Sequence, residues 1–187
     1  MPAIPPAHAL QLLLEGNQRY VTDRATHPRQ RPSDAPQHPL AVILSCSDSR
    51  VPPGIFFDQG VGDLFIVRVA GNTYDRLALQ SIDYAVNHLG STLIIVIGHD
   101  QCGAVGAAVK AYPDPSGGPM LTNIYAAVRE ARGQAGDELS NAIDDNAVLI
   151  ARKLSGETEL AAKVKSGQIA IRPARYILKT GVVKLLK

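Results

Sequence analysis

Two cysteines and a histidine in this sequence have the types and spacing of a transition-metal site. Cys46 directly follows the apolar run 40–45, and His99 directly follows a second run, 92–98, with Cys102 three residues later. Two thiolates and an imidazole suit Zn²⁺, and three protein ligands leave a fourth position open, as in catalytic zinc sites. A water molecule there becomes a nucleophile near neutral pH. The same pattern also fits two small buried thiols or a redox pair, with a histidine that is satisfied at a strand end.

A carboxylate and a guanidinium stand close to the first cysteine. Asp48 comes two residues after Cys46, and Arg50 comes two residues after Asp48. Arginine binds a carboxylate through two charge-assisted hydrogen bonds, which would hold Asp48 in one orientation. Such a carboxylate can accept the proton of a zinc-bound hydroxide and direct its lone pair toward a substrate. It can also move onto the metal as a fourth ligand and close the site. The alternative is that both residues are ordinary polar loop residues.

The elements that must position these residues follow an α/β pattern. Strands are expected over 40–45, 64–69 and 92–98, and the first and third are apolar without alternation, as in strands buried on both faces of a parallel sheet. Helical patterns cover 7–15, 76–89, 103–111, 121–132 and 137–154. Strands that alternate with helices predict a mostly parallel central sheet flanked by helices. Ligands bind beyond the carboxyl ends of such strands, where Cys46 and His99 are expected.

The N-terminal segment departs from this alternation. Residues 7–15 are expected to form a short helix that ends at Gly16 and Asn17, because these residue types tolerate left-handed backbone. The stretch 27–39 contains four prolines and no periodicity, which is typical of an extended arm. The arm could lie on its own domain or wrap a second copy of the chain.

The C-terminal segment predicts further strand. The runs 169–176 and 182–186 are both rich in aliphatic residues. Because proline cannot donate a ladder hydrogen bond, Pro173 is expected to confine the first of these strands to an edge of the sheet.

Composition narrows the classes of protein. With 187 residues, 45% hydrophobic and 19% charged, the chain can bury a large core as one domain without disulfides or a structural metal. The net charge is +2 and no basic run is present, so nucleic acid is not expected as a partner. The longest apolar runs are far shorter than the roughly 20 residues of a membrane span, so no membrane location is expected. No secretory signal pattern opens the chain, so a cytoplasmic location is expected.

Several segments together resemble the β-class carbonic anhydrases. The resemblance is carried by Cys46-Ser47-Asp48-Ser49-Arg50, by His99-Asp100-Gln101-Cys102-Gly103, by the segment 62–72, and by flanking matches at 14–20 and 180–182. It extends over nearly the whole chain. It implies a single zinc domain over residues 1–187, in which residues 1–39 form an N-terminal helix and an extended arm, with an α/β sheet that ends in a C-terminal edge strand.

The resemblance also implies the roles of the site residues. Cys46, His99 and Cys102 would bind one Zn²⁺ per chain. Asp48 and Arg50 would be the catalytic pair, and Asp48 would bind the metal in a closed state only. Because two thiolates cancel the charge of the zinc ion, its water should be less acidic than in an all-histidine site, where the pKa is about 7. Activity is therefore expected to rise on the alkaline side.

A substrate pocket and an assembly are implied in the same way. The carbon dioxide pocket would contain Gln37, Phe65, Tyr84 and Gly103, with the phenylalanine and the tyrosine acting across a subunit boundary. The chain would then form a homodimer or a tetramer built from dimers.

The implied reaction is the reversible hydration of carbon dioxide to bicarbonate and a proton. Two alternatives stay open. The same zinc site could hydrolyse carbonyl sulfide or carbon disulfide. The protein could also be a non-catalytic zinc or thiol sensor in which Cys46 and Cys102 form a reversible disulfide, although such a sensor would not need an oriented Asp48.

Overall fold

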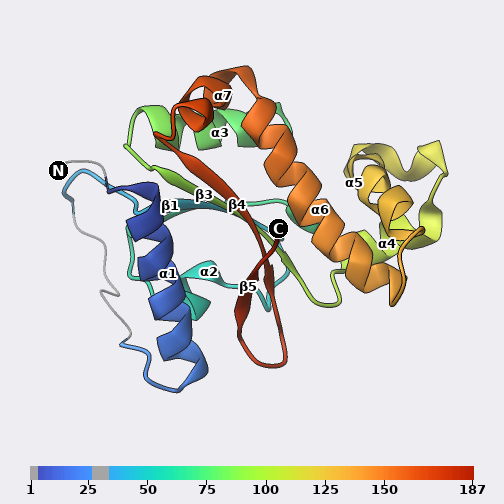
Figure 1. Cartoon of the computed structure of the whole chain (residues 1–187), viewed down its shortest axis with the longest axis horizontal. Helices are drawn as coiled ribbons and strands as arrows, with labels where there is room; N and C mark the ends of the chain where they lie inside the picture. The colour runs from blue at the N-terminus through green and yellow to red at the C-terminus, as the bar shows by residue number, and fades with distance from the viewer. Residues whose placement is uncertain (1–3, 27–33) are drawn as a thin grey trace.

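A computed structural model describes residues 4–26 and 34–187 (Figure 1). Residues 27–33 of the expected arm lie outside the described residues, and 34–39 contain no helix or strand. In the described part of the chain, five strands form one sheet in the order β2-β1-β3-β4-β5. Their bounds are β1 Ala41–Ser45, β2 Leu64–Arg68, β3 Leu93–His99, β4 Ala170–Tyr176 and β5 Val183–Leu185. The first four are parallel and β5 is antiparallel to β4, which confirms the mostly parallel α/β sheet.

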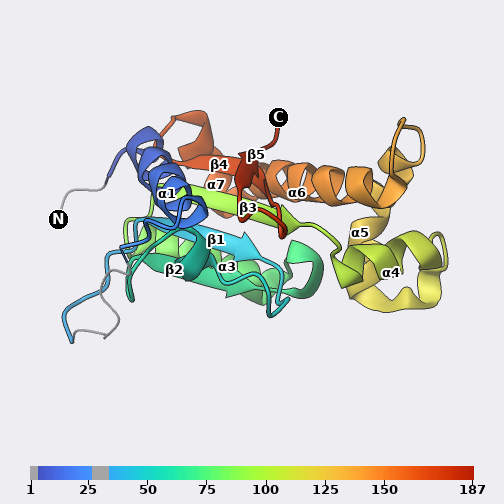
Figure 2. The same cartoon turned by 90° about the horizontal axis from the view of Figure 1, so that it is seen from below.

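Helices cover both faces of this sheet (Figures 1 and 2). They are α1 Pro6–Val21, α2 Pro53–Phe56, α3 Arg76–Asn87, α4 Gly103–Ala111, α5 Gly118–Ala131, α6 Glu138–Gly156 and α7 Thr158–Lys165, with 3₁₀ turns η1 Ala70–Asn72 and η2 Pro115–Gly117. Helices α1 and α2 pack on one face, and α3, α6 and α7 pack on the other. Helices α4 and α5 lie beside one end of α6, away from α1 (Figure 2). None of the described helices has the length and apolar character needed to cross a membrane.

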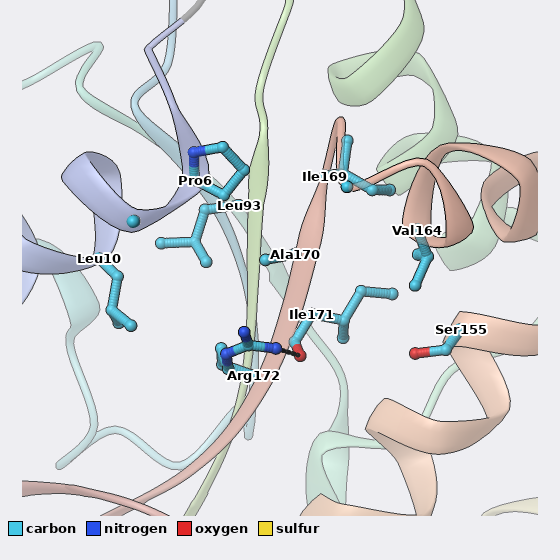
Figure 3. Close-up of a pocket in the computed structure, with 11 residues that line it drawn as sticks. Pro6, Leu10, Leu93, Ser155, Val164, Ile169, Ala170, Ile171 and Arg172 are labelled. Carbon is cyan, nitrogen blue, oxygen red and sulfur yellow. Dashed lines mark hydrogen bonds between the residues drawn. The ribbon is translucent and has the colours of Figure 1, made fainter.

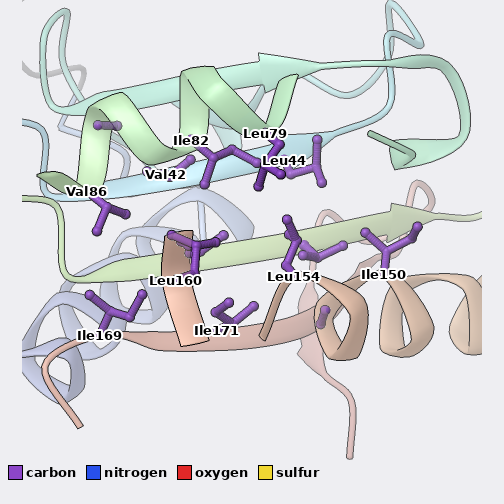
Figure 4. Close-up of a cluster of buried hydrophobic side chains, with 14 of the residues drawn as sticks. Val42, Leu44, Leu79, Ile82, Val86, Ile150, Leu154, Leu160, Ile169 and Ile171 are labelled. Carbon is purple, nitrogen blue, oxygen red and sulfur yellow. The ribbon is translucent and has the colours of Figure 1, made fainter. Parts of the chain in front are cut away.

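The continuous apolar runs of β1 and β3 reflect burial on both faces. Val42 and Leu44 face α3, α6 and α7, where they pack with residues such as Ile82 and Leu154 (Figure 4). The intervening Ile43 points to the opposite face, which α1 and α2 cover. Because successive side chains of a strand point to opposite faces, both sets must be apolar when both faces are covered.

The predicted end of the first helix is wrong. Helix α1 continues through Gly16 and Asn17, both of them buried, to Val21. A Cβ atom on Gly16 would lie 1.9 Å from the carbonyl oxygen of Phe57, so glycine is needed here for close packing of α1 against the end of α2. The glycine therefore marks a contact between helices and not a helix terminus.

The predicted edge position of Pro173 is also wrong. Strand β4 lies between β3 and β5, so the edge strand is β5. The carbonyl oxygen of Pro173 accepts a hydrogen bond of 3.0 Å from the N–H of Leu186, so the backbone of Pro173 faces the β5 side. Because the N and C=O groups of one strand residue point the same way, the proline removes no donor from the ladder between β3 and β4. The expected edge strand at the C-terminus is present, as β5.

Candidate metal centre

The carboxyl ends of two adjacent parallel strands bring the three candidate ligands together. Cys46 follows the last residue of β1, and His99 is the last residue of β3. The two strands pair directly, and Cys102 stands on the short turn that leads from β3 into α4. The ligand atoms of Cys46, His99 and Cys102 all lie within 4.8 Å of one another, and all three residues are buried. The pairing of the strands is therefore what assembles the cluster.

The geometry of the cluster fits a zinc ion. The Sγ atoms of Cys46 and Cys102 are 3.9 Å apart. Two sulfurs bound to one tetrahedral zinc at about 2.3 Å would be about 3.8 Å apart. Nδ1 of His99 lies 2.9 Å from the carbonyl oxygen of Asp100, which favours a proton on Nδ1. Nε2 is buried and has no hydrogen-bond partner among the described residues, so its lone pair is available to a metal.

The two thiols influence each other strongly. The pKa of Cys46 is lowered because its sulfur is hydrogen-bonded to Cys102, with smaller contributions from His99 and the Gly71 N–H, while burial opposes the shift. The pKa of Cys102 is raised by the same hydrogen bond and by burial. The contact between the two sulfurs therefore favours the thiolate of Cys46 and the thiol of Cys102. Both groups must be deprotonated to bind a metal, so metal binding here would release a proton.

Asp48 stands beside the cluster, held by Arg50. The Arg50 side chain donates from Nε to Oδ1 of Asp48 at 3.0 Å and from Nη2 to Oδ2 at 2.8 Å, and its backbone N–H donates to Oδ1 at 2.9 Å. Oδ2 of Asp48 lies 3.9 Å from Nε2 of His99. The Arg50 guanidinium holds the pKa of this carboxyl far below its usual range. Asp48 is therefore an ionised, oriented hydrogen-bond acceptor next to the metal ligands.

A second arginine, Arg68 at the end of β2, fixes the loop that carries this pair. Its Nε donates to the carbonyl oxygen of Cys46 at 3.1 Å, and its Nη2 donates to that of Asp48 at 2.6 Å. Arg68 is not among the site residues predicted from the sequence. Its position could have identified it, because Arg68 ends the strand that pairs with β1, and β1 leads into the Cys46 motif.

A third arginine, Arg175 on β4, supports the loop after β3. It bonds to the Asp100 carboxylate from Nε at 2.7 Å and from Nη2 at 2.6 Å. Its Nη1 also donates to Oγ of Ser140 and to Oδ1 of Asp144 on α6. Because the carbonyl oxygen of Asp100 accepts from His99, this network holds the residue that orients the imidazole. Sequence reasoning missed it, since the partners are far apart in the chain.

The four expected pocket residues lie in different parts of the structure. The rings of Phe65 and Tyr84 have centroids 6.5 Å apart, on β2 and α3. Phe65 pairs with Val42, four residues before Cys46, which places it about 13 Å back along the strand direction. Gln37 is exposed in the segment before β1. The remaining residue, Gly103, adjoins the cluster because it directly follows Cys102, and it is exposed at the start of α4.

A cavity of about 480 Å³ lies between α1 and α7 at the opposite end of the sheet (Figure 3). Leu93 and Ala170, the first residues of β3 and β4, contribute to its wall, together with Leu10 and Arg172. His99 lies at the other end of β3, Cys102 follows it, and Cys46 follows the neighbouring end of β1. The cavity is therefore separate from the metal centre.

Comparison with known proteins gives a consistent result. A family model described as carbonic anhydrase matches residues 41–183. Carbonic anhydrase 2 of Mycobacterium tuberculosis is 50% identical over 119 residues, which cover 61% of this chain and 58% of that protein. The carbonic anhydrase of Mycolicibacterium smegmatis is 45% identical over 125 residues, covering 63% and 61%. The matches thus span less than two thirds of these relatives.

Solved structures agree with the fold. A Coccomyxa β-carbonic anhydrase in complex with acetazolamide superposes with a TM-score of 0.71 at 26% identity, covering 95% of this chain and 86% of that one. One of two β-carbonic anhydrases described as tetrameric, from Sordaria macrospora, gives a TM-score of 0.69 at 22% identity, covering 81% and 82%. Because the family model matches well over half of the sequence and the fold is shared, the chain belongs to the carbonic anhydrase family, in its β class.

Proposed function

We propose that this protein catalyses the reversible hydration of carbon dioxide to bicarbonate and a proton, with one Zn²⁺ per chain held by Cys46, His99 and Cys102. The observation that carries the proposal is the position of Asp48. Its carboxylate lies 3.9 Å from the free Nε2 of His99, and Arg50 binds both of its oxygens. A site that only stores zinc does not need a fixed acceptor at this place.

The metal and the protein contribute different parts of the chemistry. Zinc in a site with three protein ligands supplies a Lewis acid that makes a water molecule nucleophilic near neutral pH. Asp48 accepts a hydrogen bond from the attacking oxygen, so that a lone pair points toward the carbon of the substrate. Because Arg50 keeps this carboxyl ionised, it acts as an acceptor only and does not deliver a proton. Fixing the donor and the acceptor in advance lowers the cost of reaching the transition state.

Asp48 could also close the site. In a closed state its carboxylate would take the fourth position on the metal. This movement breaks the paired hydrogen bonds that Arg50 makes with Asp48, so the open state is favoured while that pair is intact. A zinc X-ray absorption spectrum that is unchanged between pH 6 and pH 9 would exclude a pH-dependent exchange between the two states.

A second copy of the chain would complete the substrate pocket. Phe65 and Tyr84 have ring centroids 6.5 Å apart, and Phe65 pairs with Val42, about 13 Å back along the strand direction from Cys46 of its own chain. Tyr84 is 47% exposed, and Ile66 and Leu77 on the same two elements are 41% and 73% exposed. We therefore propose a homodimer, or a tetramer built from dimers, in which Phe65 and Tyr84 of one protomer approach the site of the other, and Gln37 and Gly103 also line the pocket. The tetrameric β-carbonic anhydrases among the structural neighbours support such assembly.

Stopped-flow hydration of carbon dioxide at pH 7 and pH 8.5, on protein of known zinc content, tests the activity. We expect rapid turnover that requires zinc and rises with pH, and no turnover by Cys46→Ser. Hydrolysis of carbonyl sulfide and carbon disulfide is measured on the same samples. If carbonyl sulfide or carbon disulfide is turned over faster than carbon dioxide, the protein is instead a hydrolase of those substrates. If the protein binds one zinc per chain and turns over none of the three substrates, the result favours a sensor.

A further inference from the structure

A buried asparagine on α6 is hydrogen-bonded to the turn that contacts the metal ligand Cys46. Asn146 is 1% exposed, and its Nδ2 donates to the carbonyl oxygen of Gly71 at 2.8 Å. The two residues are 75 positions apart in the chain. Asn146 also interrupts an apolar stripe of α6 formed by residues such as Ile143, Ala147 and Ile150. A polar residue in an apolar helix face is costly to bury unless it is hydrogen-bonded. The hydrogen bond to Gly71 is therefore what makes an asparagine tolerable at this position.

The partner, Gly71, is itself bonded to the candidate metal site. Its N–H donates to Sγ of Cys46 at 3.3 Å. Gly71 has a φ of +70°, which favours glycine, and a Cβ atom there would lie 2.7 Å from Cδ1 of Ile124. One residue therefore offers its N–H to the ligand sulfur and its C=O to Asn146. Holding the carbonyl restricts the backbone angles that decide where the N–H points.

We propose that Asn146 is a positioning residue for the thiolate of Cys46, acting through Gly71. The inference rests on the zinc site proposed above. A hydrogen bond to a metal-bound thiolate fixes its orientation and withdraws electron density from the sulfur. Partners of this kind typically change metal affinity by about 10- to 100-fold when they are removed. Gly71 is the direct donor, and Asn146 keeps that donor aimed.

The competing explanation is that Asn146 only joins α6 to η1. Asn17 provides a matched control for that role. It is also buried, and its Nδ2 donates to the carbonyl oxygens of Phe56 at 2.9 Å and Gly181 at 2.7 Å. Its Oδ1 accepts from the N–H of Val183 at 2.8 Å. These contacts join α1, α2 and the C-terminal hairpin and involve none of the candidate ligands. A purely structural asparagine should therefore behave like Asn17.

The test compares Asn146→Leu with Asn17→Leu in the full chain. Zinc affinity is measured by competition with a chelator, and the stability of the metal-free protein by thermal unfolding. The sulfur-to-metal charge-transfer band of the Co²⁺-loaded protein reports on the thiolates. We expect Asn146→Leu to weaken zinc binding by about 10- to 100-fold and to move the band to longer wavelength, since the sulfur regains electron density. Asn17→Leu should lower the unfolding temperature and leave both metal readouts at wild-type values.

Asn146→Asp gives a second measurement if the leucine variant does not fold, because it keeps the shape and replaces the donor by an acceptor. Like Asn146→Leu, it should weaken zinc binding and move the charge-transfer band to longer wavelength. Wild-type zinc affinity with an unshifted band in the folded Asn146 variant would overturn the inference while the metal site stands. Failure of the wild-type chain to bind zinc at one per chain would instead overturn the proposed function, and this inference with it.

Discussion

The two loops that carry the metal ligands are held in different ways. The loop after β1 brings Cys46 and Asp48, and it is fixed by arginines near the surface, with the Arg50 side chain 51% exposed. The end of β3 and the loop after it bring His99 and Cys102, and this segment is fixed through Asp100 by Arg175, whose side chain is only 13% exposed. The two segments are therefore expected to have different roles. We expect metal retention to depend most on the end of β3 and its loop, and orientation of the reacting oxygen to depend most on the loop after β1.

Removing a ligand from the β3 loop should have the largest effect. Cys102→Ser removes one of three zinc ligands, and the site should then hold well under a tenth of a zinc ion per chain after dialysis against a chelator. Metal analysis measures this directly, and circular dichroism shows whether the variant is folded. Retention of one zinc per chain by folded Cys102→Ser would contradict the assignment of the ligands.

Changing the acceptor in the β1 loop should separate catalysis from metal binding. Asp48→Asn keeps the shape but removes the charge and makes one side of the group a donor. Zinc content should stay at one per chain, while kcat/KM for carbon dioxide falls by about 10²- to 10³-fold, the range typical of one lost preorganised hydrogen bond in an active site. Activity within threefold of the wild type would show that Asp48 does not orient the reaction.

Breaking the support of the β3 loop should weaken the metal without removing a ligand. Arg175→Gln leaves Asp100 without its ion pair, and zinc affinity should fall by about 10-fold or more. Arg172→Gln is the matched control on the same strand, because Arg172 donates to the carbonyl oxygen of the neighbouring Ile171 and contacts no ligand loop. Equal zinc affinities of the two variants would contradict the role of the Arg175 network.

The smallest effect is expected for the contribution of the Asp48–Arg50 pair to the stability of the folded chain. A carboxyl with a lowered pKa stabilises the folded state above its unfolded pKa of about 3.9, and this contribution disappears as the pH falls toward its folded pKa. Because the pair is near the surface, solvent screening should make its contribution to the free energy of unfolding small. Arg50→Gln should therefore lower the unfolding temperature of the metal-free protein by no more than about 4 °C at pH 7. The difference in unfolding temperature between the wild type and Arg50→Gln should shrink below pH 4. A difference that grows as the pH falls would contradict the expected pH dependence.

Much of the scaffold could be predicted because it follows from local pattern. The continuous apolar runs identified β1 and β3, and residues 103–111 form α4 as expected. The ends of those strands then indicated where Cys46 and His99 would meet. Gly16 and Pro173 were misinterpreted because their roles depend on Phe57 and on β5, which are not adjacent in sequence.

The supports of the site could not be predicted for the same reason. Arg68, Arg175 and Asn146 act on backbone or side-chain groups that only the folded chain brings near them. The one local signal is the polar residue in the apolar stripe of α6. Residues that bind a metal can be identified by type and spacing, whereas the residues that aim them are identified by tertiary contacts.

The decisive experiment is a titration of zinc into the metal-free protein, with the initial rate of carbon dioxide hydration measured at pH 8.5 after each addition. We expect the rate to rise linearly with added zinc and to stop rising at one zinc per chain. Asp48→Asn should bind the same amount of zinc but hydrate carbon dioxide far more slowly. A fully zinc-loaded wild-type protein that does not accelerate the hydration would contradict the proposed function.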